Sequence, residues 1–211
     1  MNGIFITGTG TGVGKTFFTA ACTRALRKRG IPALALKPIS CGGRTDEELY
    51  AKANEETLSL NEINHIHLAP PLSPYAASAV ENKPFDLSAL RDGINSVTAR
   101  HPGPFLIEGV GGWLVPITRD YWVRDWAREL DLPVCLVAGA GLGTINHTLL
   151  TVESIRQSGA RILGIVLNHH GVPDDMAAQT NPAILEDLSG LPVLRFHGPE
   201  DLLKLPSWLL P

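Results

Sequence analysis

The sequence predicts an α/β fold, in which a mostly parallel sheet is covered by helices on both faces. Short apolar runs recur along the chain, and they do not alternate with polar residues as half-exposed strands do. Segments of helical composition separate these runs. A Gly-rich segment, residues 8–16, directly follows the first apolar run and precedes the first helical segment. These features together favour a three-layer sandwich of helix, sheet and helix.

The first half of the chain begins with an expected strand at residues 3–7, followed by the Gly-rich loop. Residues 17–30 contain several alanines and a leucine, which favour helix. Residues 33–37 form a second apolar run that a proline ends. Residues 46–60 are rich in Glu, Leu and Ala and are expected to be helical, whereas residues 65–74 are rich in proline and are expected to form a loop.

The second half of the chain continues the alternation of strands and helices. The expected strands are residues 105–108, 134–138 and 162–167, with a last edge strand near Val193. The expected helices are residues 87–100, 123–130, 145–157 and 183–188. Because ligands of such sheets bind at the carboxyl ends of the strands, these ends are where functional residues are expected.

Length and composition restrict the class of protein. The chain has 211 residues, enough for one well-buried core, and we expect a single domain over residues 1–211. The net charge is −3 and no basic block occurs, so a nucleic-acid partner is not expected. No apolar run approaches the ~18 residues of a membrane span. Three cysteines without close pairing indicate a reducing compartment, and hence the cytoplasm.

The Gly-rich segment has the features of a phosphate-binding loop. Residues 8–16 read G-T-G-T-G-V-G-K-T, between a predicted strand and a predicted helix. Backbone N–H groups of such a loop and of the helix N-terminus bind phosphate oxygens. Lys15 is expected to reach the β- and γ-phosphates, and the Thr16 hydroxyl is expected to bind Mg²⁺. Five residues separate Gly8 from Gly14, one more than in the usual pattern, so the loop is a variant.

A dinucleotide-binding loop is the main alternative for this segment. Its fingerprint requires a third glycine after Gly10 and Gly12, and Lys15 stands in that place. A nucleoside triphosphate is therefore the preferred ligand.

Charged and polar residues close three of the other predicted strands. Lys37, Glu108 and Asn168 each lie where a predicted strand ends. In a parallel sheet these ends share one edge with the phosphate-binding loop, so the side chains are expected to meet there. Glu108 together with Thr16 supplies the hard oxygen ligands that a magnesium nucleotide needs. Asp46 opens a predicted helix, where an acidic residue is also a common first-turn feature.

Five ordered motifs resemble the dethiobiotin synthetase family over most of the chain. The motifs are T-G-T-G-T-G-V-G-K-T at 7–16, L-K-P-I-x-C-G at 36–42, P-L-S-P-Y-A-A at 71–77, E-G-V-G-G-W at 108–113, and L-G-T-I-N-H-T-L-L-T at 142–151 followed by G-x-x-x-N at 164–168. The resemblance implies a P-loop NTPase-like sandwich and an ATP-dependent ligase. Diaminopelargonic acid would take up CO₂ as a carbamate, ATP would phosphorylate the carbamate, and the second amine would close the ring to dethiobiotin.

The resemblance also implies roles for individual residues. Catalytic roles fall to Thr11, Lys15 and Lys37. Nucleotide contacts fall to Gly12, Val13, Gly14, Lys15, Thr16, Phe17, Glu108, Gly111, Asn168 and Pro199. Mg²⁺ ligands would be Thr16, Asp46 and Glu108. Substrate contacts fall to Lys37, Cys41, Gly143, Thr144, Ile145 and Asn146, the last four serving the site of a neighbouring subunit, which implies a homodimer.

The chain departs from the family pattern in three places. The span between Gly43 and Asp46 is shorter than in the family. Position 41 usually carries a hydroxyl that contacts substrate, and here it is Cys41. The segment at 195–200 replaces the usual adenine-side loop.

Two other functions are alternatives to the dethiobiotin-forming ligase. A nucleotide-switch ATPase acting on a protein partner would share the loop but would leave the motifs at 71–77 and 142–151 unexplained. A ligase that amidates a larger acid would need a glutamine-hydrolysing domain, for which the chain is too short.

Overall fold

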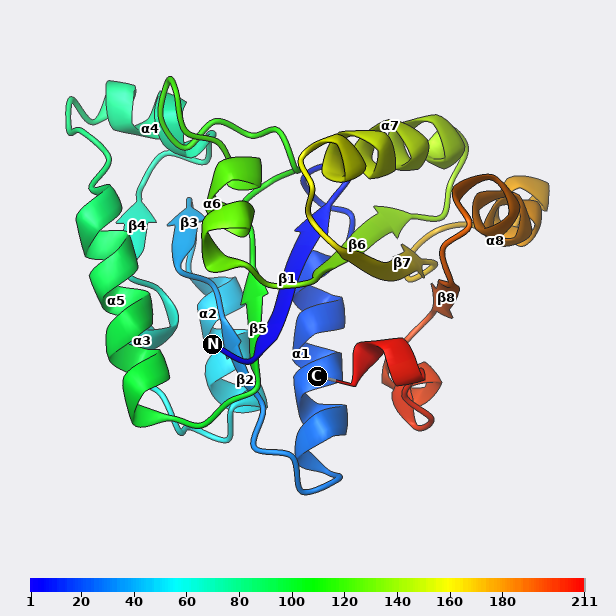
Figure 1. Ribbon diagram of the computed structural model, residues 1–211, viewed down its shortest axis with the longest axis horizontal. Coiled ribbons are helices and arrows are strands. Elements are labelled where there is room, and N and C mark those ends of the chain that lie inside the picture. Colours follow the sequence, from blue (N-terminus) through cyan, green and yellow to red (C-terminus); the bar gives the residue numbers. More distant parts are fainter. Residues whose placement is uncertain (211) are drawn as a thin grey trace.

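A six-stranded parallel sheet forms the centre of the protein (Figure 1). The structure is a computed structural model that describes residues 1–210. The strands lie in the order β2-β5-β1-β6-β7-β8. Their bounds are β1 (Gly3–Gly8), β2 (Leu34–Leu36), β5 (Phe105–Glu108), β6 (Val134–Gly139), β7 (Ile162–Asn168) and β8 (Val193–Phe196). The predicted parallel sheet is therefore confirmed.

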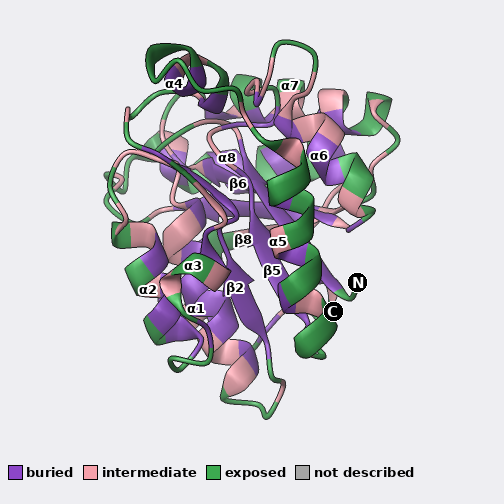
Figure 2. Ribbon diagram, turned by 90° about the vertical axis from the view of Figure 1, so that its left-hand side faces the viewer, coloured by how far each residue is buried: buried purple, intermediate pink, exposed green. Residues whose placement is uncertain are grey.

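Helices cover both faces of this sheet. Figure 2 shows the buried strands between α1 and α2 on one side and α5 and α6 on the other. The helices are α1 (Lys15–Arg27), α2 (Thr45–Ala53), α3 (Leu60–Ile63), α4 (Pro74–Val80), α5 (Leu87–Arg100), α6 (Val123–Leu130), α7 (Thr144–Gln157) and α8 (Met176–Ser189). Two short 3-10 helices, η1 (Pro199–Leu202) and η2 (Ser207–Leu209), follow β8. The α/β sandwich expected from the sequence is confirmed.

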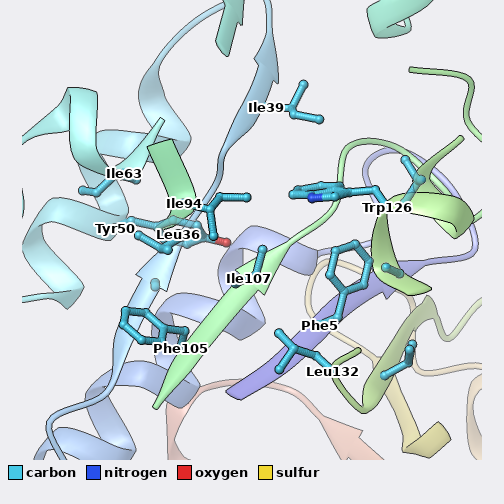
Figure 3. Packing of buried hydrophobic residues seen from close by; sticks show 14 of the residues in the cluster. Phe5, Leu36, Ile39, Tyr50, Ile63, Ile94, Phe105, Ile107, Trp126 and Leu132 are labelled. Carbon is cyan, nitrogen blue, oxygen red and sulfur yellow. The ribbon is translucent and has the colours of Figure 1, made fainter. Parts of the chain in front are cut away.

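The two-sided cover explains why the strands lack an alternating pattern. Ile4 and Ile6 of β1 pack in one apolar cluster with Phe18 of α1. Phe5, between them, points to the opposite face and meets Trp126 of α6 edge to face, with ring centroids 5.2 Å apart. Figure 3 shows this second cluster beside β5 and β1. Since successive strand residues face opposite sides, both sets of side chains must be apolar.

A second, two-stranded parallel sheet was not predicted. It consists of β3 (Ile39–Cys41) and β4 (Ile66–Leu68), so the expectation that residues 65–74 form only a loop was wrong. Pro38 ends β2, but its carbonyl accepts hydrogen bonds from the backbone N–H groups of His65 and Ile66. The proline therefore interrupts the chain without preventing a new strand directly after it.

Two predicted helices differ most from their expected bounds. The helix expected at 46–60 is divided into α2 and α3. Helix α2 ends before Asn54, because the Asn54 side chain bonds the backbone N–H and the carbonyl oxygen of Ala35, at 2.7 and 3.0 Å. Glu55 and Glu56 then adopt left-handed conformations. The helix expected at 183–188 begins earlier, at Met176, and includes Pro182.

Helix α4 was also missed by the sequence analysis. Ser73 caps it by accepting a hydrogen bond from the backbone N–H of Ala76, and Pro74 takes its first position. Proline is favoured there because the first helical N–H has no partner within the helix. Among residues 1–210, no helix is both long and apolar enough to cross a membrane. The three cysteines, Cys22, Cys41 and Cys135, are free thiols.

Candidate functional site

A cavity of about 650 Å³ lies where β1, β2 and β5 end. Among its lining residues are most of those predicted from the sequence: Thr11, Gly12, Gly14, Lys15, Thr16, Phe17, Lys37, Cys41, Asp46, Glu108 and Gly111. They come from the loop after β1 and the start of α1, from the residue after β2, from the end of β3, from the start of α2, and from the end of β5 and the loop after it. The rule that ligands bind at strand carboxyl ends thus brings distant parts of the chain into one site.

The loop after β1 is held in place by β7. Gly14 precedes α1 with a φ of 96°, and a Cβ there would lie 2.1 Å from the Asn168 side-chain nitrogen. The same nitrogen donates to the Val13 carbonyl at 3.1 Å. Lys15 is 6% exposed and donates to the Gly10 carbonyl at 2.9 Å. A glycine is therefore required at position 14 both for its conformation and for the close approach of Asn168.

The loop after β5 packs directly against the loop after β1. A Cβ on Gly112 would lie 3.3 Å from the Gly10 Cα atom and from the Gly8 carbonyl oxygen. Gly111, which lines the cavity, is in a left-handed conformation. This contact places Glu108 beside the residues of the first loop.

Lys37 is the centre of the polar contacts in the cavity. Its ammonium donates to Glu108 Oε1 at 3.1 Å, lies 3.5 Å from Thr16 Oγ1, and also bonds the Asp46 carboxylate. Thr16 donates to the same Glu108 oxygen at 3.1 Å. The strand register explains the meeting, because Leu36 of β2 pairs with Ile107 of β5 and the next residues are Lys37 and Glu108.

The two lysines of the cavity have opposite pKa shifts. Burial alone would lower the pKa of Lys37, but Glu108 and Asp46 raise it above its ordinary value, so this side chain stays an ammonium. The pKa of Lys15 is lowered, chiefly by burial and also by the charge of Lys37, although Glu108 opposes the shift. Among residues 1–210 no carboxylate is bonded to Lys15, and an incoming phosphate would supply negative charge there.

Tyr50 belongs to the site, and the sequence analysis did not find it. Its hydroxyl donates to Glu108 Oε2, on the side of the carboxylate away from Lys37 and Thr16. Tyr50 follows Asp46 by four residues, so the two share one face of α2. Helical spacing from Asp46 was the signal that could have identified it.

Cys41 lines the cavity at the end of β3 and is half-buried. Burial, with a further effect of Glu81, raises the pKa of its thiol to about 11, so the thiol is protonated at neutral pH. The neighbouring Ser40 hydroxyl is already engaged, because it donates to Asn64 Oδ1 at 3.2 Å and lies 3.1 Å from His67 Nδ1. Of these two neighbouring side chains, as far as the described residues show, the Cys41 thiol is therefore the one that can still bind a ligand in the cavity.

The remaining predicted site residues lie outside the cavity, as far as the described part of the chain defines it. Val13 and Asn168 are neighbours behind the loop, and Pro199 is exposed at the start of η1. Phe17, by contrast, lines the cavity, and its ring also packs at a tilt against that of His170, with ring centroids 4.6 Å apart. The last group is a segment at the start of α7 whose residues do not line the cavity: Gly143, Thr144, Ile145 and Asn146.

The donor set fits a magnesium ion that accompanies a nucleotide. Within residues 1–210, no three His, Cys, Asp or Glu side chains come together as a closed metal site. Thr16 Oγ1 and Glu108 Oε1 are instead 3.1 Å apart and face the same ammonium as Asp46. Mg²⁺ favours such a site, with a few protein oxygens and the other ligands drawn from phosphate and water.

Comparisons with known proteins agree with the motifs. The family described as an AAA domain matches residues 2–196. A protein of Akkermansia muciniphila named ATP-dependent dethiobiotin synthetase BioD is 39% identical over 200 residues, which cover 94% of this chain and 93% of the relative. Proteins of the same name from Aquifex aeolicus and Endomicrobium trichonymphae are 39% and 34% identical, and cover 97% and 99% of this chain and 92% and 98% of their own lengths.

Solved structures show the same fold at much lower identity. The cell division ATPase MinD of Pyrococcus furiosus has a TM-score of 0.54 at 18% identity, over 92% of this chain and 82% of its own. MinD of Pyrococcus horikoshii, complexed with Mg-ADP, also has a TM-score of 0.54, at 16% identity, over 97% and 86% of the two chains. These likenesses establish the fold alone, whereas the near full-length relatives establish the family. The chain belongs to the dethiobiotin synthetase family.

Proposed function

We propose that this protein is an ATP-dependent ligase that carboxylates diaminopelargonic acid with CO₂ and closes the ring to dethiobiotin, in the cytoplasm. The observation that carries the proposal is the meeting of Lys15, Lys37, Thr16 and Glu108 in one cavity, in a chain of the dethiobiotin synthetase family. These residues suit a phosphate donor and an anionic acceptor.

The proposed reaction is the one that the resemblance to dethiobiotin synthetases implies, and the charges in the cavity suit it. One amine of the substrate takes up CO₂ and loses a proton, which gives a carbamate. A carbamate oxygen attacks the γ-phosphorus, and ADP leaves. The second amine then attacks the carbamate carbon, and phosphate leaves as the ring closes. Negative charge is concentrated at the transferred phosphoryl group, so two fixed ammonium groups stabilise the transition state.

Each cavity residue has a role in this proposal. Lys15, with backbone N–H groups of residues 12–17, binds the phosphates of ATP, and Thr11 lies beside phosphate and substrate. Lys37 contacts both the γ-phosphate and the carbamate, and holds them in line. Thr16, Asp46 and Glu108 would hold Mg²⁺, whose charge would neutralise the phosphate oxygens during transfer. Asn168 and Pro199 lie on the adenine side.

The substrate carboxylate is proposed to bind the start of α7 in a neighbouring subunit. A helix N-terminus binds anions through its free N–H groups. Residues 143–146 do not reach the cavity of their own chain, as the described residues define it. Leu142 and Leu150, on either side of them, are 92% and 63% exposed, and such apolar surface suits an interface. We therefore include a homodimer in the proposal.

The experiment that tests the function is a product assay. Phosphate release from Mg-ATP is followed with bicarbonate, with and without diaminopelargonic acid, and dethiobiotin is identified by mass spectrometry. Phosphate and dethiobiotin are expected to rise together. ATP hydrolysis that ignores the diamine and gives no new product would favour a nucleotide switch instead.

Replacing Lys37 by alanine is expected to remove most turnover while ATP still binds. The ammonium stabilises the transferred group, and losing one such donor costs about 100-fold or more in rate. Single-turnover kinetics and ATP titration separate the two effects. Lys52→Ala, an exposed lysine on α2, is the control and should keep normal turnover. Normal turnover of Lys37→Ala would contradict its role.

Cys41→Ser is expected to keep or raise activity, because a hydroxyl donates hydrogen bonds better than a thiol. The effect should appear in the KM for diaminopelargonic acid rather than in the KM for ATP. A large loss of activity would show that position 41 does not contact substrate in the expected way.

Mixing two inactive variants tests the shared site. Lys37→Ala disables the cavity, and Gly143→Val strains the left-handed residue before α7. After subunit exchange, random pairing gives half mixed dimers with one intact site each, and hence about a quarter of normal activity. If activity does not recover although light scattering shows dimers, the two substitutions affect the site of the same subunit, which would contradict the shared site.

A further inference from the structure

The carboxylate of Glu108 has separate partners on its two oxygens. Oε1 accepts hydrogen bonds from Thr16 and Lys37, each at 3.1 Å. Oε2 accepts the hydroxyl of Tyr50. Glu108 is 1% exposed and Tyr50 is 0% exposed, so water does not compete for these contacts. The orientation of the carboxylate is therefore set by protein groups on both sides.

Packing alone does not explain a tyrosine at this position. The ring belongs to the apolar cluster that also contains Leu36 and Ile107, and Figure 3 shows the three side chains in that cluster. A phenylalanine would fill the same space without burying a hydroxyl. A buried hydroxyl is costly unless it is bonded, and here its acceptor is Glu108.

Helix α2 supplies two of the groups that surround the polar centre of the cavity. Asp46, in its first turn, bonds the Lys37 ammonium, and Tyr50, one turn later, bonds Glu108. The helix thus fixes both the lysine and the carboxylate that this lysine contacts.

We propose that Tyr50 is a positioning residue: its hydroxyl turns Glu108 so that Oε1 faces Thr16, and thereby sets the affinity of the site for the divalent cation of the nucleotide. The inference rests on the proposed role of Glu108 as a metal ligand. Without the hydroxyl, Glu108 Oε2 has no hydrogen-bond donor at a place from which water is excluded. The carboxylate then turns, so that both of its oxygens share the donors Thr16 and Lys37. The phosphates keep their contacts with the loop, so metal binding should suffer more than nucleotide binding.

The test is Tyr50→Phe, with Mn²⁺ as the metal probe and a non-hydrolysable ATP analogue. Electron paramagnetic resonance measures free Mn²⁺, so the readout does not depend on turnover. Mn²⁺ affinity should fall about 10-fold to 100-fold, as for other groups that orient a metal ligand. The Mg²⁺ concentration for half-maximal activity should rise similarly, while kcat at saturating Mg²⁺ changes little.

Tyr121→Phe is the matched control. Its hydroxyl also donates to a carboxylate, Glu129 Oε2 at 2.6 Å. Tyr121 precedes α6 and Glu129 lies near the end of that helix, and neither residue lines the cavity. This variant should bind Mn²⁺ normally. A double variant of Tyr50→Phe and Glu108→Gln should bind Mn²⁺ no more weakly than Glu108→Gln alone, because Tyr50 acts through Glu108.

Three results would overturn the proposal. These are unchanged Mn²⁺ affinity in Tyr50→Phe, additive losses in the double variant, and a Tyr50→Phe chain that does not fold, since the hydroxyl would then serve stability. The proposed function is tested separately by dethiobiotin formation in the unsubstituted protein. Dethiobiotin formation with normal Mn²⁺ binding by Tyr50→Phe would reject the inference alone. Weakened Mn²⁺ binding without any dethiobiotin would reject the proposed function alone.

Discussion

The ion pairs between Lys37 and the two carboxylates, Asp46 and Glu108, are the contacts on which the site depends. They require β2 and β5 to be neighbours in the sheet, and α2 to begin above them. A buried ammonium is costly without partners, and removing one member of such a group leaves an unpaired charge. In the proposed reaction this ammonium stabilises the transferred phosphoryl group. The two carboxylates that hold Lys37 in the structure are also the proposed metal ligands, so a nucleotide that arrives with its cation would redistribute these contacts.

Much of the fold could be predicted because burial on both faces leaves a clear pattern in the strands. The strands β1, β5, β6 and β7 are apolar at successive positions, since Phe5 and its neighbours Ile4 and Ile6 face different helical layers. The sheet edge that holds the cavity followed from the parallel arrangement, and so did the meeting of Lys37 and Glu108 with the Gly-rich loop. Local signals were sufficient here because β1 ends at a glycine, β5 ends at Glu108, and Lys37 directly follows β2.

The rest depended on contacts between distant segments. Asn54 ends α2 because it bonds Ala35 of β2, and β3 forms because β4 pairs with it. In both pairs the partners are far apart in the sequence. In the sequence, Tyr50 looks like any other buried aromatic residue. Only the fold brings Glu108 next to its hydroxyl. Fold and family are also shown by different comparisons. The MinD structures share the architecture at 16–18% identity and show the fold. The motifs and the near full-length relatives identify the dethiobiotin synthetase family.

In the proposed function, the γ-phosphate of ATP passes to a carbamate and not to water. Labelling CO₂ with ¹⁸O and analysing the released phosphate by mass spectrometry tests this directly. In the proposed reaction a carbamate oxygen bonds the phosphorus, and ring closure breaks the bond between that oxygen and carbon. We therefore expect one labelled oxygen in each phosphate formed with dethiobiotin. Unlabelled phosphate, released at the same rate, would show that water attacked the nucleotide and that no carbamate was phosphorylated.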